Sequence, residues 1–523
     1  MEVAQILIDG QWRAADAEET FHAENPAKGA ALPIAFPTSR WSDCDLALTA
    51  ATKAAAELRN LAPAKIADFL DAYATNIEAA SAAIVAAANE ETALPVTPRL
   101  KDVELPRTTN QLRQAATAVR EESWRNATLD LEKNIRSCFA SIGPVVVFGP
   151  NNFPFAFNGV SGGDFVAAIA AGNPVIAKAH PLHPNTTRLL AEQALKALEE
   201  TGLPLATVQM IYNVSNDNGL KLVSDPRVGA VGFTGSRNAG LHLKRAAEDV
   251  GIPIYLEMSS INPVIFLAGA LAERSEQLAQ ELVDSVLAGS GQFCTSPNLI
   301  LVFKTPQTEA FLLQIAKSFA DRPAQPLLSA GGRKQLHQGV AALTTAGAQL
   351  VTGGDLAPGE GYRYANTLLR ATAAQFLAAP HDLQREIFGN ATLAVVVSTQ
   401  EELQSILRLL EGNLTGAIYS AKSDVDDDAY NAIAPILREK VGRLLNDKMP
   451  TGVAVSPAMN HGGPFPATSN PGVTSVGIPA AITRFAKLEC YDAVRAERLP
   501  AILKDTIANP GTWRSINGTW TKG

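Results

Sequence analysis

The chain has 523 residues, a length that predicts about three domains of ordinary size rather than a single core. A hydrophobic fraction of 46% and a charged fraction of 18% are typical of a soluble globular protein, and a formal net charge of −8 without runs of lysine or arginine argues against nucleic acid as a main partner. No apolar segment reaches the roughly 18 residues needed to cross a bilayer, so no membrane span is expected.

The cysteines are scattered along the chain at Cys44, Cys138, Cys294 and Cys490. Such spacing predicts neither a disulfide framework nor a zinc site, and it favours a reducing compartment. The first residues have an acidic Glu2 and no basic group before an apolar run, so they do not resemble a signal peptide. We therefore expect a cytoplasmic protein.

The first part of the chain combines a short hairpin with several helices. Residues 5–10 predict a strand that ends in the hairpin signal Asp9-Gly10, and residues 11–13 predict the returning strand. Asn25-Pro26 starts a turn. Residues 121–142 are polar and β-like, which favours a projecting hairpin. Alanine-rich helices are predicted over 41–59, over 63–93 as a pair, and over 99–120.

From residue 143 onward, short apolar strands alternate with helices. Apolar runs bounded by turn residues are typical of strands buried in a parallel sheet. The strands are predicted at 143–150, 174–178, 208–212, 228–233 and 254–257. The helices between them are predicted at 158–171, 186–201, 216–224 and 237–250. This alternation indicates βαβ units in a doubly wound parallel sheet.

A second alternating series begins at residue 262. Its strands are predicted at 264–267, 298–303, 348–352, 391–398 and 417–420. Its helices are predicted at 272–288, 308–320, 332–346, 400–410 and 424–438. Residues 451–475 are rich in loop-forming residues, and the tail from 476 predicts one helix and then extended pieces. The predicted fold class is therefore α/β, with two doubly wound parallel-sheet domains and ligands between them at the carboxyl ends of the strands.

The stretch Gly289–Pro297 places Cys294 among small residues, after an apolar helix and before an apolar strand. Glycine tolerates positive φ, so Gly289 and Gly291 allow the backbone to bend closely around a ligand. A cysteine on its own is most often a small buried hydrophobe. Its partners elsewhere in the chain therefore decide whether Cys294 is a nucleophile.

Other short motifs at strand ends carry groups that the oxidation of an aldehyde requires. That reaction needs a nucleophile, an oxyanion donor, a base for water and a dinucleotide site. Gly235 and Ser236 open a helix after a strand, so that free N–H groups and the helix dipole face a phosphate. Each motif alone is weak evidence for this chemistry, whereas the order of the motifs along the chain is strong evidence. The motifs are Gly149–Pro154 with Asn152, Phe233–Gly240, Tyr255–Pro263 with Glu257, and Gln384–Asn390.

Together with Gly291-Gln-Phe-Cys294, these motifs resemble the aldehyde dehydrogenase superfamily, and the resemblance covers most of the chain. It implies that the Cys294 thiolate attacks the carbonyl, and that the Asn152 amide and the Cys294 backbone N–H hold the oxyanion. It also implies that Glu257 activates the water that hydrolyses the thioester. The sequence departs from the family pattern at Asn151 in place of tryptophan, at 258–261 in place of Leu-Gly-Gly-Lys, and at Asn390 in place of proline.

The resemblance also implies an organisation into domains. Residues 1–120 and 143–261 are expected to form the dinucleotide-binding domain, and residues 262–475 the catalytic domain. Residues 121–142 and 476–523 resemble the small β oligomerisation element of the family. We therefore expect a homodimer or a homotetramer.

The expected cofactor is NADP, with NAD also accepted. Many NAD-preferring members of the family carry a glutamate three residues after the lysine at 178, where this sequence has Pro181. Since no carboxylate repels a 2′-phosphate there, Lys178 can pair with it. His180 and His183 are flanked by prolines without a nearby carboxylate, and no metal is expected. By resemblance, the cofactor contacts are Phe148, Lys178, His180, Gly235, Ser236, Gly240, Met258, Glu386 and Phe388.

The segments Arg107–Arg113, Lys178–Pro184 and His461–Ser469 resemble more narrowly the 2,5-dioxopentanoate (α-ketoglutarate semialdehyde) dehydrogenase subgroup. An NADP-dependent fatty-aldehyde dehydrogenase belongs to the same neighbourhood. An anionic substrate needs a cation, and Arg107 and Arg113 are the candidates, although solvated helix arginines explain them as well. The number of aromatic residues also suits a long-chain aldehyde. The remaining candidate substrate contacts are Phe153, Phe155, Phe293, Thr295 and Phe465.

Other functions share parts of this pattern. A CoA-acylating dehydrogenase needs no hydrolytic base, so Glu257 argues against it. A cysteine hydrolase would pair Cys294 with a histidine and would cleave esters without a nucleotide. A non-catalytic protein of this fold would not need Cys294, Asn152 and Glu257 together.

Overall fold

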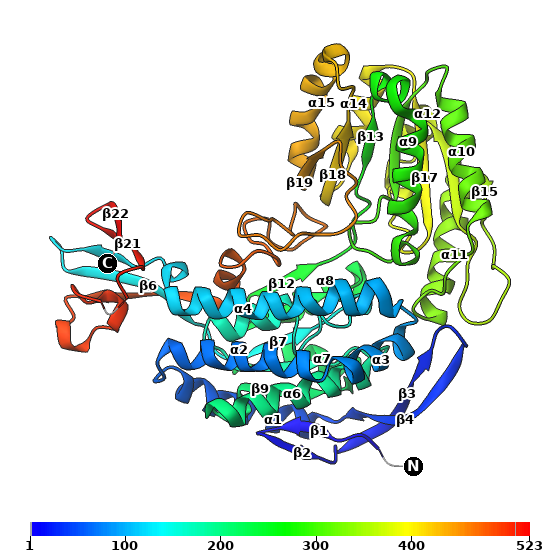
Figure 1. Ribbon diagram of the computed structural model, residues 1–523. Coiled ribbons are helices and arrows are strands. Elements are labelled where there is room, and N and C mark those ends of the chain that lie inside the picture. Colours follow the sequence, from blue (N-terminus) through cyan, green and yellow to red (C-terminus); the bar gives the residue numbers. More distant parts are fainter. Residues whose placement is uncertain (1–2, 508, 523) are drawn as a thin grey trace.

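The computed structural model describes residues 3–507 and 509–522, and Figure 1 shows two stacked bodies with an arm at one side. The lower body holds the N-terminal helices and the first large sheet, and the upper body holds the second large sheet. Across these two ranges, we find no helix with the length and apolar character needed to cross a membrane.

The first large sheet is seven-stranded, with the order β12-β11-β7-β8-β9-β1-β2. The hairpin predicted at Asp9-Gly10 is confirmed as its antiparallel edge, β1 (Ile6–Ile8) and β2 (Gln11–Arg13). The other strands are parallel to one another and consist of buried apolar runs, because helices pack against them. These strands are β7 (Val145–Phe148), β8 (Val175–Lys178), β9 (Val208–Ile211), β11 (Ala230–Thr234) and β12 (Ile254–Glu257).

The helices of the lower body surround this sheet. A π-helical turn, Val96–Glu104, precedes α4, where the sequence predicts one continuous helix. The helices are α1 (Trp41–Leu58), α2 (Pro63–Ala79), α3 (Ser81–Thr92), α4 (Leu105–Glu121), α5 (Gly163–Ala170), α6 (Pro184–Thr201), α7 (Asn216–Val223) and α8 (Arg237–Glu248).

The second large sheet is also seven-stranded, with the order β15-β16-β17-β14-β13-β18-β19. Its strands are β13 (Val264–Phe266), β14 (Leu299–Phe303), β15 (Gln349–Thr352), β16 (Thr367–Thr372), β17 (Ala391–Val397), β18 (Asn413–Tyr419) and β19 (Val441–Asn446). Its helices are α9 (Ala268–Leu287), α10 (Thr308–Asp321), α11 (Ala330–Thr345), α12 (Ala373–Ala378), α13 (Pro380–Leu383), α14 (Gln400–Leu409) and α15 (Asp427–Lys440). Two successive α/β sheets confirm the predicted fold class. The predicted division after residue 261 stays a prediction.

Two smaller sheets complete the fold. A three-stranded sheet joins β10 (Asn213–Val214), β4 (Ala30–Ser39) and β3 (Ala17–Asn25). The arm in Figure 1 is a five-stranded sheet that includes the hairpin predicted within 121–142. Its strands, in sheet order, are β20 (Ala486–Asp492), β6 (Ile135–Ser141), β5 (Thr128–Asp130), β21 (Trp513–Ile516) and β22 (Thr519–Lys522).

The structure corrects several predicted elements. The helix predicted at 158–171 begins only at Gly163, because the backbone turns so tightly that a Cβ on Gly162 would lie 2.3 Å from Phe157. The predicted tail helix is a short 3-10 segment, Ala480–Phe485. The β3–β4 hairpin is not predicted, since most of β3 is exposed and polar and carries little hydrophobic signal. The strands β16 and β19 are also not predicted.

The carboxyl ends of the central strands meet at one edge of the first sheet. Phe148 of β7 is in register with Phe233 of β11, which is in register with Leu256 of β12. The residues that follow these strands therefore gather at the same edge, facing the second sheet (Figure 1).

Candidate active site

Cys294 follows a tight turn at Ala288–Gly291 that ends α9. Gly291 has a φ of +69°, and a Cβ at this position would lie 2.0 Å from the carbonyl oxygen of Gly389. Only glycine therefore allows the two backbones to approach so closely. This approach places the cysteine loop against the segment that contains Glu386.

The cysteine loop is also fixed to the connection between β12 and β13. Asn262 Nδ2 donates to the carbonyl oxygens of Cys294 and Ser296, each at 2.9 Å. Because Asn262 and Glu257 lie on the same short connection, this side chain fixes the distance between the cysteine loop and the carboxylate.

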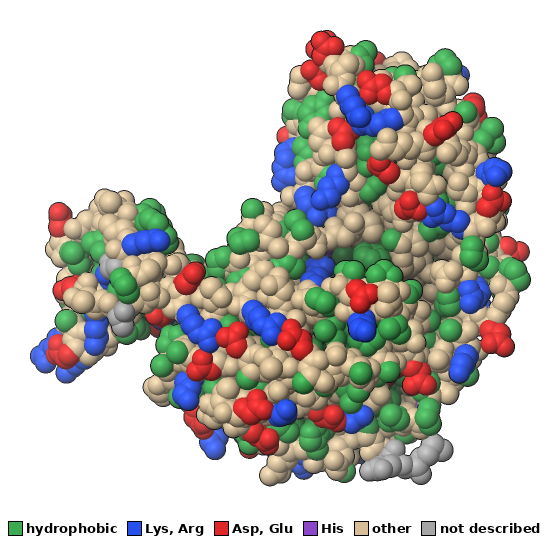
Figure 2. All heavy atoms as spheres, viewed as in Figure 1, with side chains coloured by type: hydrophobic (Ala, Val, Ile, Leu, Met, Phe, Trp, Pro, Cys, Tyr) green, Lys and Arg blue, Asp and Glu red, His purple; other side chains and the backbone are tan. Residues whose placement is uncertain are grey.

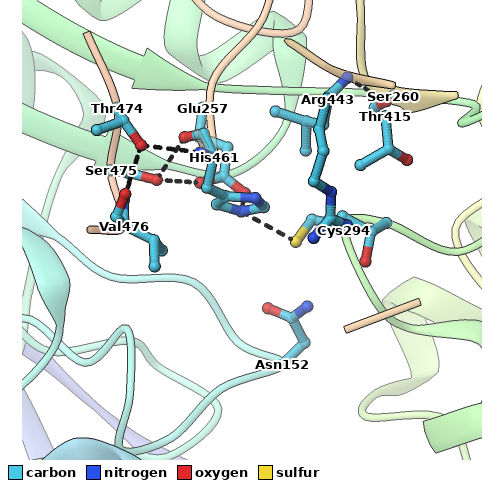
Figure 3. Close-up of polar contacts among 12 residues, drawn as sticks. Asn152, Glu257, Ser260, Cys294, Thr415, Arg443, His461, Thr474, Ser475 and Val476 are labelled. Atoms are coloured by element: carbon cyan, nitrogen blue, oxygen red, sulfur yellow. Dashed lines mark hydrogen bonds and ion pairs between the residues drawn. The ribbon is translucent and has the colours of Figure 1, made fainter. Parts of the chain in front are cut away.

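Cys294, His461 and Glu257 form a polar cluster at the centre of the site (Figure 3). The thiol Sγ lies 3.5 Å from His461 Nε2, and Glu257 Oε1 lies 2.9 Å from the same nitrogen. Ser475 Oγ donates to Glu257 Oε2 at 3.3 Å, and the His461 backbone N–H donates to Thr474 Oγ1 at 2.8 Å. One imidazole nitrogen therefore contacts both the candidate nucleophile and the candidate base.

The cluster distributes charge unevenly. Burial raises the pKa of Cys294 well above its usual range, and the charge of Glu257 raises it further, while Arg107 acts in the opposite direction. Burial also acts to raise the pKa of Glu257, but the charge and hydrogen bond of His461, with hydrogen bonds from Cys294 and Ser475, lower the pKa overall. In this arrangement the thiol keeps its proton and Glu257 is the charged group.

The same three side chains resemble a metal site, because their ligand atoms all lie within 4.8 Å of one another. Two ligands on a tetrahedral ion with bonds of about 2.0–2.1 Å are roughly 3.4 Å apart. The 2.9 Å between His461 Nε2 and Glu257 Oε1 is shorter and matches an N–H···O hydrogen bond. The geometry therefore favours proton transfer over metal binding.

Asn152 lies on the other side of Cys294 from Glu257, with its amide directed toward the thiol (Figure 3). Its Nδ2 donates to the carbonyl oxygen of Gln292 at 2.9 Å. An amide NH₂ group has two donors, so one holds the side chain in place and the other can stabilise an oxyanion beside Cys294.

A buried ion pair supports the segment that carries Asn152. Glu104 accepts hydrogen bonds from the backbone N–H groups of Phe155 and Ala156 at 2.8 and 3.0 Å. Arg99 forms an ion pair with Glu104 and donates to the carbonyl oxygen of Asn152 at 3.0 Å. The π-helical turn thus ties the Asn152 segment at three backbone groups.

Aromatic side chains wall the approach to Cys294. The Phe153 ring lies 5.3 Å from the Phe293 ring and 5.2 Å from the Phe157 ring, and Phe157 lies 5.8 Å from the His461 ring. Phe153 and Phe293 are thus brought to the site as predicted contacts, whereas Phe155 lies in the core of the first sheet. The apolar cluster comprises Phe153, Ala156, Phe157, Phe293, Val453, Val455, Met459 and Val476.

Two other predicted substrate contacts take different places. The Thr295 side chain is buried and accepts a hydrogen bond from the Gly452 N–H at 3.0 Å, so it fixes a neighbouring loop. Phe465 is 54% exposed, and the Arg237 guanidinium lies 5.8 Å from its ring centre. Phe465 therefore lies outside the apolar cluster.

The two candidate arginines differ sharply. Arg107 packs over the aromatic wall, with its guanidinium 5.3 Å from the Phe157 ring centre and 5.8 Å from that of Phe153. Arg113 instead forms two hydrogen bonds with Glu78 at 2.6 and 2.8 Å on the surface, where both side chains are exposed. The structure does not bring Arg113 to the site, and this corrects the expectation that either arginine could line it.

Residues predicted to hold a dinucleotide lie along the carboxyl edge of the first sheet. Lys178 ends β8, and burial lowers its pKa to about 8. Burial lowers the pKa of His180 well below its usual range, so this ring is neutral. His183 Nε2 lies 2.9 Å from the carbonyl oxygen of Pro150, which uses that nitrogen within the fold.

The start of α8 packs closely against side chains that come from strand ends of the first sheet. Ser236 is the N-cap, and its Oγ accepts from the Ala239 N–H at 3.3 Å. A Cβ on Gly235 would lie 2.8 Å from the Phe233 ring, and one on Gly240 would lie 3.2 Å from the Met258 sulfur. Helix N–H groups left accessible by small residues suit an anionic phosphate.

A polar cavity of about 420 Å³ adjoins the start of α8. Glu386 lines it and is half-buried. Desolvation raises its pKa to about 7, and its Oε1 accepts from the Ser260 N–H at 3.4 Å. Carboxylate and hydroxyl groups suit the hydroxyls of a ribose. Phe388 is half-buried two residues further on, and Phe148 lies 6.2 Å from the Phe233 ring. The residues present fit a dinucleotide.

Sequence reasoning missed two residues beside Cys294. His461 stands in a motif that was used only for its overall resemblance, and its partner Glu257 is far away in the chain. Arg443 reaches toward Cys294 from β19, a strand that was not predicted (Figure 3). A histidine within a Gly- and Pro-rich loop was the only available signal, and no pattern pointed to Arg443.

Two parallel α/β sheets with a thiol, an amide donor and a carboxylate between them define a nucleotide-dependent enzyme with covalent thiol chemistry. Residues 12–451 match the family model described as "Aldehyde dehydrogenase family". The chain belongs to the aldehyde dehydrogenase family and is an NAD(P)-dependent oxidoreductase of that family.

Similar proteins extend over nearly the whole chain. "Alpha-ketoglutaric semialdehyde dehydrogenase 2" of Azospirillum brasilense is 38% identical and aligns over 97% of both chains. The "Alpha-ketoglutaric semialdehyde dehydrogenase" of Acinetobacter baylyi is 36% identical over 99% of this chain and 98% of its own length. Among solved structures, an aldehyde dehydrogenase from Bacillus cereus superposes with a TM-score of 0.81 at 20% identity, covering 94% of this chain and 96% of its own.

Proposed function

We propose that this protein oxidises α-ketoglutarate semialdehyde (2,5-dioxopentanoate) to 2-oxoglutarate with NADP, and that NAD is also accepted. The observation that carries the chemistry is the contact of Cys294 and Glu257 with the same His461 nitrogen, opposite the Asn152 amide. The named relatives at 38% and 36% identity support the choice of substrate.

The first step is the attack of Cys294 on the aldehyde carbon. The thiol must lose its proton, and the charged Glu257, which accepts a hydrogen bond from Cys294 directly, is the acceptor, while the His461 Nε2–H holds the same carboxylate in place. The carbonyl oxygen gains negative charge as the C–S bond forms. The second N–H of Asn152 and the backbone N–H of Cys294 stabilise that charge, which raises the rate by donors that are already oriented.

When bound, the nicotinamide supplies a hydride acceptor for the carbon that is attached to Cys294. The residues that would hold the cofactor are Lys178, Ser236 and Glu386. Lys178 ends β8, Ser236 follows β11, and Glu386 lies in the loop before β17. The protein's own task is then to hydrolyse the thioester. Once the proton taken from the thiol has passed to solvent, Glu257 is again ionised and is held by Ser475 and His461, so it can take a proton from water and release the acid.

Ester hydrolysis by a cysteine nucleophile is a second candidate activity, because Cys294 Sγ lies 3.5 Å from His461 Nε2. Its turnover requires no nucleotide. A CoA-acylating reaction is less well supported, since the buried Glu257 provides the base for hydrolysis that such a reaction does not need.

The arm supports an assembly as a homodimer or homotetramer. Its surface exposes large apolar side chains, with Leu488 61%, Trp513 45% and Trp520 53% exposed. Such residues are favoured at contacts between subunits. A cytoplasmic location is consistent with the four cysteines, none of which is in a disulfide in the described part of the chain.

Steady-state rates test the function directly. We expect the enzyme to reduce NADP, and NAD less efficiently, with α-ketoglutarate semialdehyde, and the acid to form in equal amount without CoA. Cys294→Ala should abolish the reaction but still bind NADPH, measured by fluorescence. Nucleotide reduction by Cys294→Ala at the wild-type rate, or ester cleavage as the sole activity, would refute the proposal.

A further inference from the structure

Arg107 on α4 has a buried guanidinium edge that makes no hydrogen bond to the described part of the chain. Its Nε and Nη2 atoms are buried and make no hydrogen bond to any described residue, and no ion pair of Arg107 occurs within these residues. An unpaired buried cation is unfavourable, and structures retain one mainly where it binds something. The Nε and Nη2 hydrogens point in the same direction and can donate two parallel hydrogen bonds to one carboxylate.

Glu104, the acidic residue with the largest effect on the pKa of Arg107, cannot neutralise it. Glu104 raises the pKa of Arg107, against a larger lowering by burial. The Glu104 carboxylate, however, already pairs with Arg99 and accepts two backbone N–H groups. Two guanidinium groups, Arg99 and Arg107, thus share one carboxylate, Glu104. These three side chains together leave one positive charge beside the Phe153 and Phe157 rings.

Only one layer of side chains separates Arg107 from the reacting groups. Its guanidinium lies over Phe157 at 5.3 Å and over Phe153 at 5.8 Å. Phe157 contacts His461, and Phe153 contacts Phe293, the residue before Cys294. Cys294 and Glu257 are among the charges that act on Arg107. Figure 2 shows a hollow between the two bodies with basic side chains beside it.

We propose that Arg107 binds the carboxylate of the aldehyde substrate, so that the enzyme selects aldehydes with an anionic far end over uncharged aliphatic aldehydes. This inference rests on the proposed function and deepens it. The aldehyde carbon lies at Cys294, the carbon chain passes the Phe153 and Phe157 rings, and the carboxylate ends at the Nε–Nη2 edge. An alkyl chain would leave that edge without a partner.

Arg443 is the rival cation. Its Nη2 donates to the carbonyl oxygens of Pro450 and Gly452 at 3.0 and 3.1 Å, and its Nη1 lies 3.7 Å from the Met459 sulfur. Only its Nε lacks a partner within the described ranges. The two N–H groups of Arg443 that remain, one on Nε and one on Nη1, do not lie on one edge of the guanidinium, so they cannot form the two parallel bonds that a carboxylate prefers.

The test compares α-ketoglutarate semialdehyde with pentanal, which has the same number of carbons and no charge. The measured quantity is the ratio of their kcat/KM values with NADP. Wild-type enzyme should favour the anion, and Arg107→Met should lower the ratio by roughly 10- to 150-fold, the range of charge-assisted hydrogen bonds. Arg107→Lys should recover part of it, because it restores the charge without the planar pair of donors.

Arg113→Met is the matched control, because it removes an arginine from the same helix and leaves the ratio unchanged. A ratio within threefold of wild type in Arg107→Met, or a selective loss in Arg443→Met instead, would overturn the assignment. If wild-type enzyme oxidised no aldehyde with either nucleotide, the proposed function would fail. Calorimetric binding of 2-oxoglutarate to Cys294→Ala, with and without Arg107→Met, then tests Arg107 by itself: equal affinities would refute it.

Discussion

Replacing His461 tests whether the cluster of Cys294, His461 and Glu257 transfers protons or has only a structural role. In His461→Asn, Cys294 loses a contact at 3.5 Å and Glu257 loses a hydrogen bond at 2.9 Å. Proton transfer by a positioned side chain contributes about 10²- to 10⁴-fold to a rate, so kcat should fall within that range. The variant keeps Asn152 and the aromatic wall, and KM for the aldehyde should change much less.

The pH dependence of His461→Asn gives a second, directional result. His461 lowers the pKa of Glu257 through its charge and its hydrogen bond, against burial, which acts to raise it. Without His461, burial prevails and the pKa of Glu257 rises. A base with a raised pKa is protonated over more of the acidic range, so the acidic limb of the kcat profile should move to higher pH.

The assay measures kcat for NADP reduction between pH 5 and pH 9 and, separately, the rate at which iodoacetamide alkylates Cys294. His242→Gln is the control, because His242 is exposed and contacts only the Asn238 carbonyl at 2.8 Å on its own helix. A kcat within threefold of wild type together with an unmoved acidic limb would show that His461 only fills space.

Three further predictions concern the surroundings of the cluster. Glu104→Ala should destabilise the protein by about 3–5 kcal/mol in urea unfolding, because it leaves Arg99 buried without its carboxylate; a loss below 1 kcal/mol would contradict the role of the pair. Gly291→Ala should lower Tm more than Gly251→Ala: both have positive φ, but only the Cβ at 291 meets backbone, 2.0 Å from Gly389. The KM for NADP should rise as pH falls through about 7, because the pKa of Glu386 is raised to about 7 and the protonated acid is a poorer acceptor; Glu386→Gln should have a higher KM without this pH dependence.

Local sequence signals predict the strands that are buried on both faces, wherever in the chain their neighbours lie. Apolar runs between turn residues located β7, β8, β9, β11 and β12, because a strand covered on both faces consists almost wholly of buried residues. Strand β3 was not predicted, because it is an exposed edge strand whose polar composition is like that of a loop. Strand β19 escaped for another reason: its pattern mixes buried and half-buried residues after a helix without a clear break.

Some site residues can be identified from the sequence, and others only from the tertiary structure. Asn152 follows β7, Glu257 ends β12 and Cys294 precedes β14. Each stands in a short motif next to an apolar strand, so the sequence identifies it. The role of His461 depends on a contact between loops that are far apart in the chain, which no spacing reveals. Arg107 and Arg113 share a helix and a residue type, and only the tertiary partner, Glu78, distinguishes them.

The position of His461 follows from how its loop pairs with β12. The Met258 N–H donates to the Ala467 carbonyl at 2.7 Å, and Glu257 forms an isolated β-bridge with Thr468. The loop thus extends the first sheet by backbone pairing and delivers His461 in a register fixed relative to Glu257. Glu257 and His461 are therefore held together by backbone pairing to the first large sheet, whereas Cys294 lies on the loop that leads into the second sheet. The 2.9 Å contact is thus set within the first sheet, whereas the 3.5 Å contact also depends on the Asn262 hydrogen bond that holds the Cys294 carbonyl to the connection after β12.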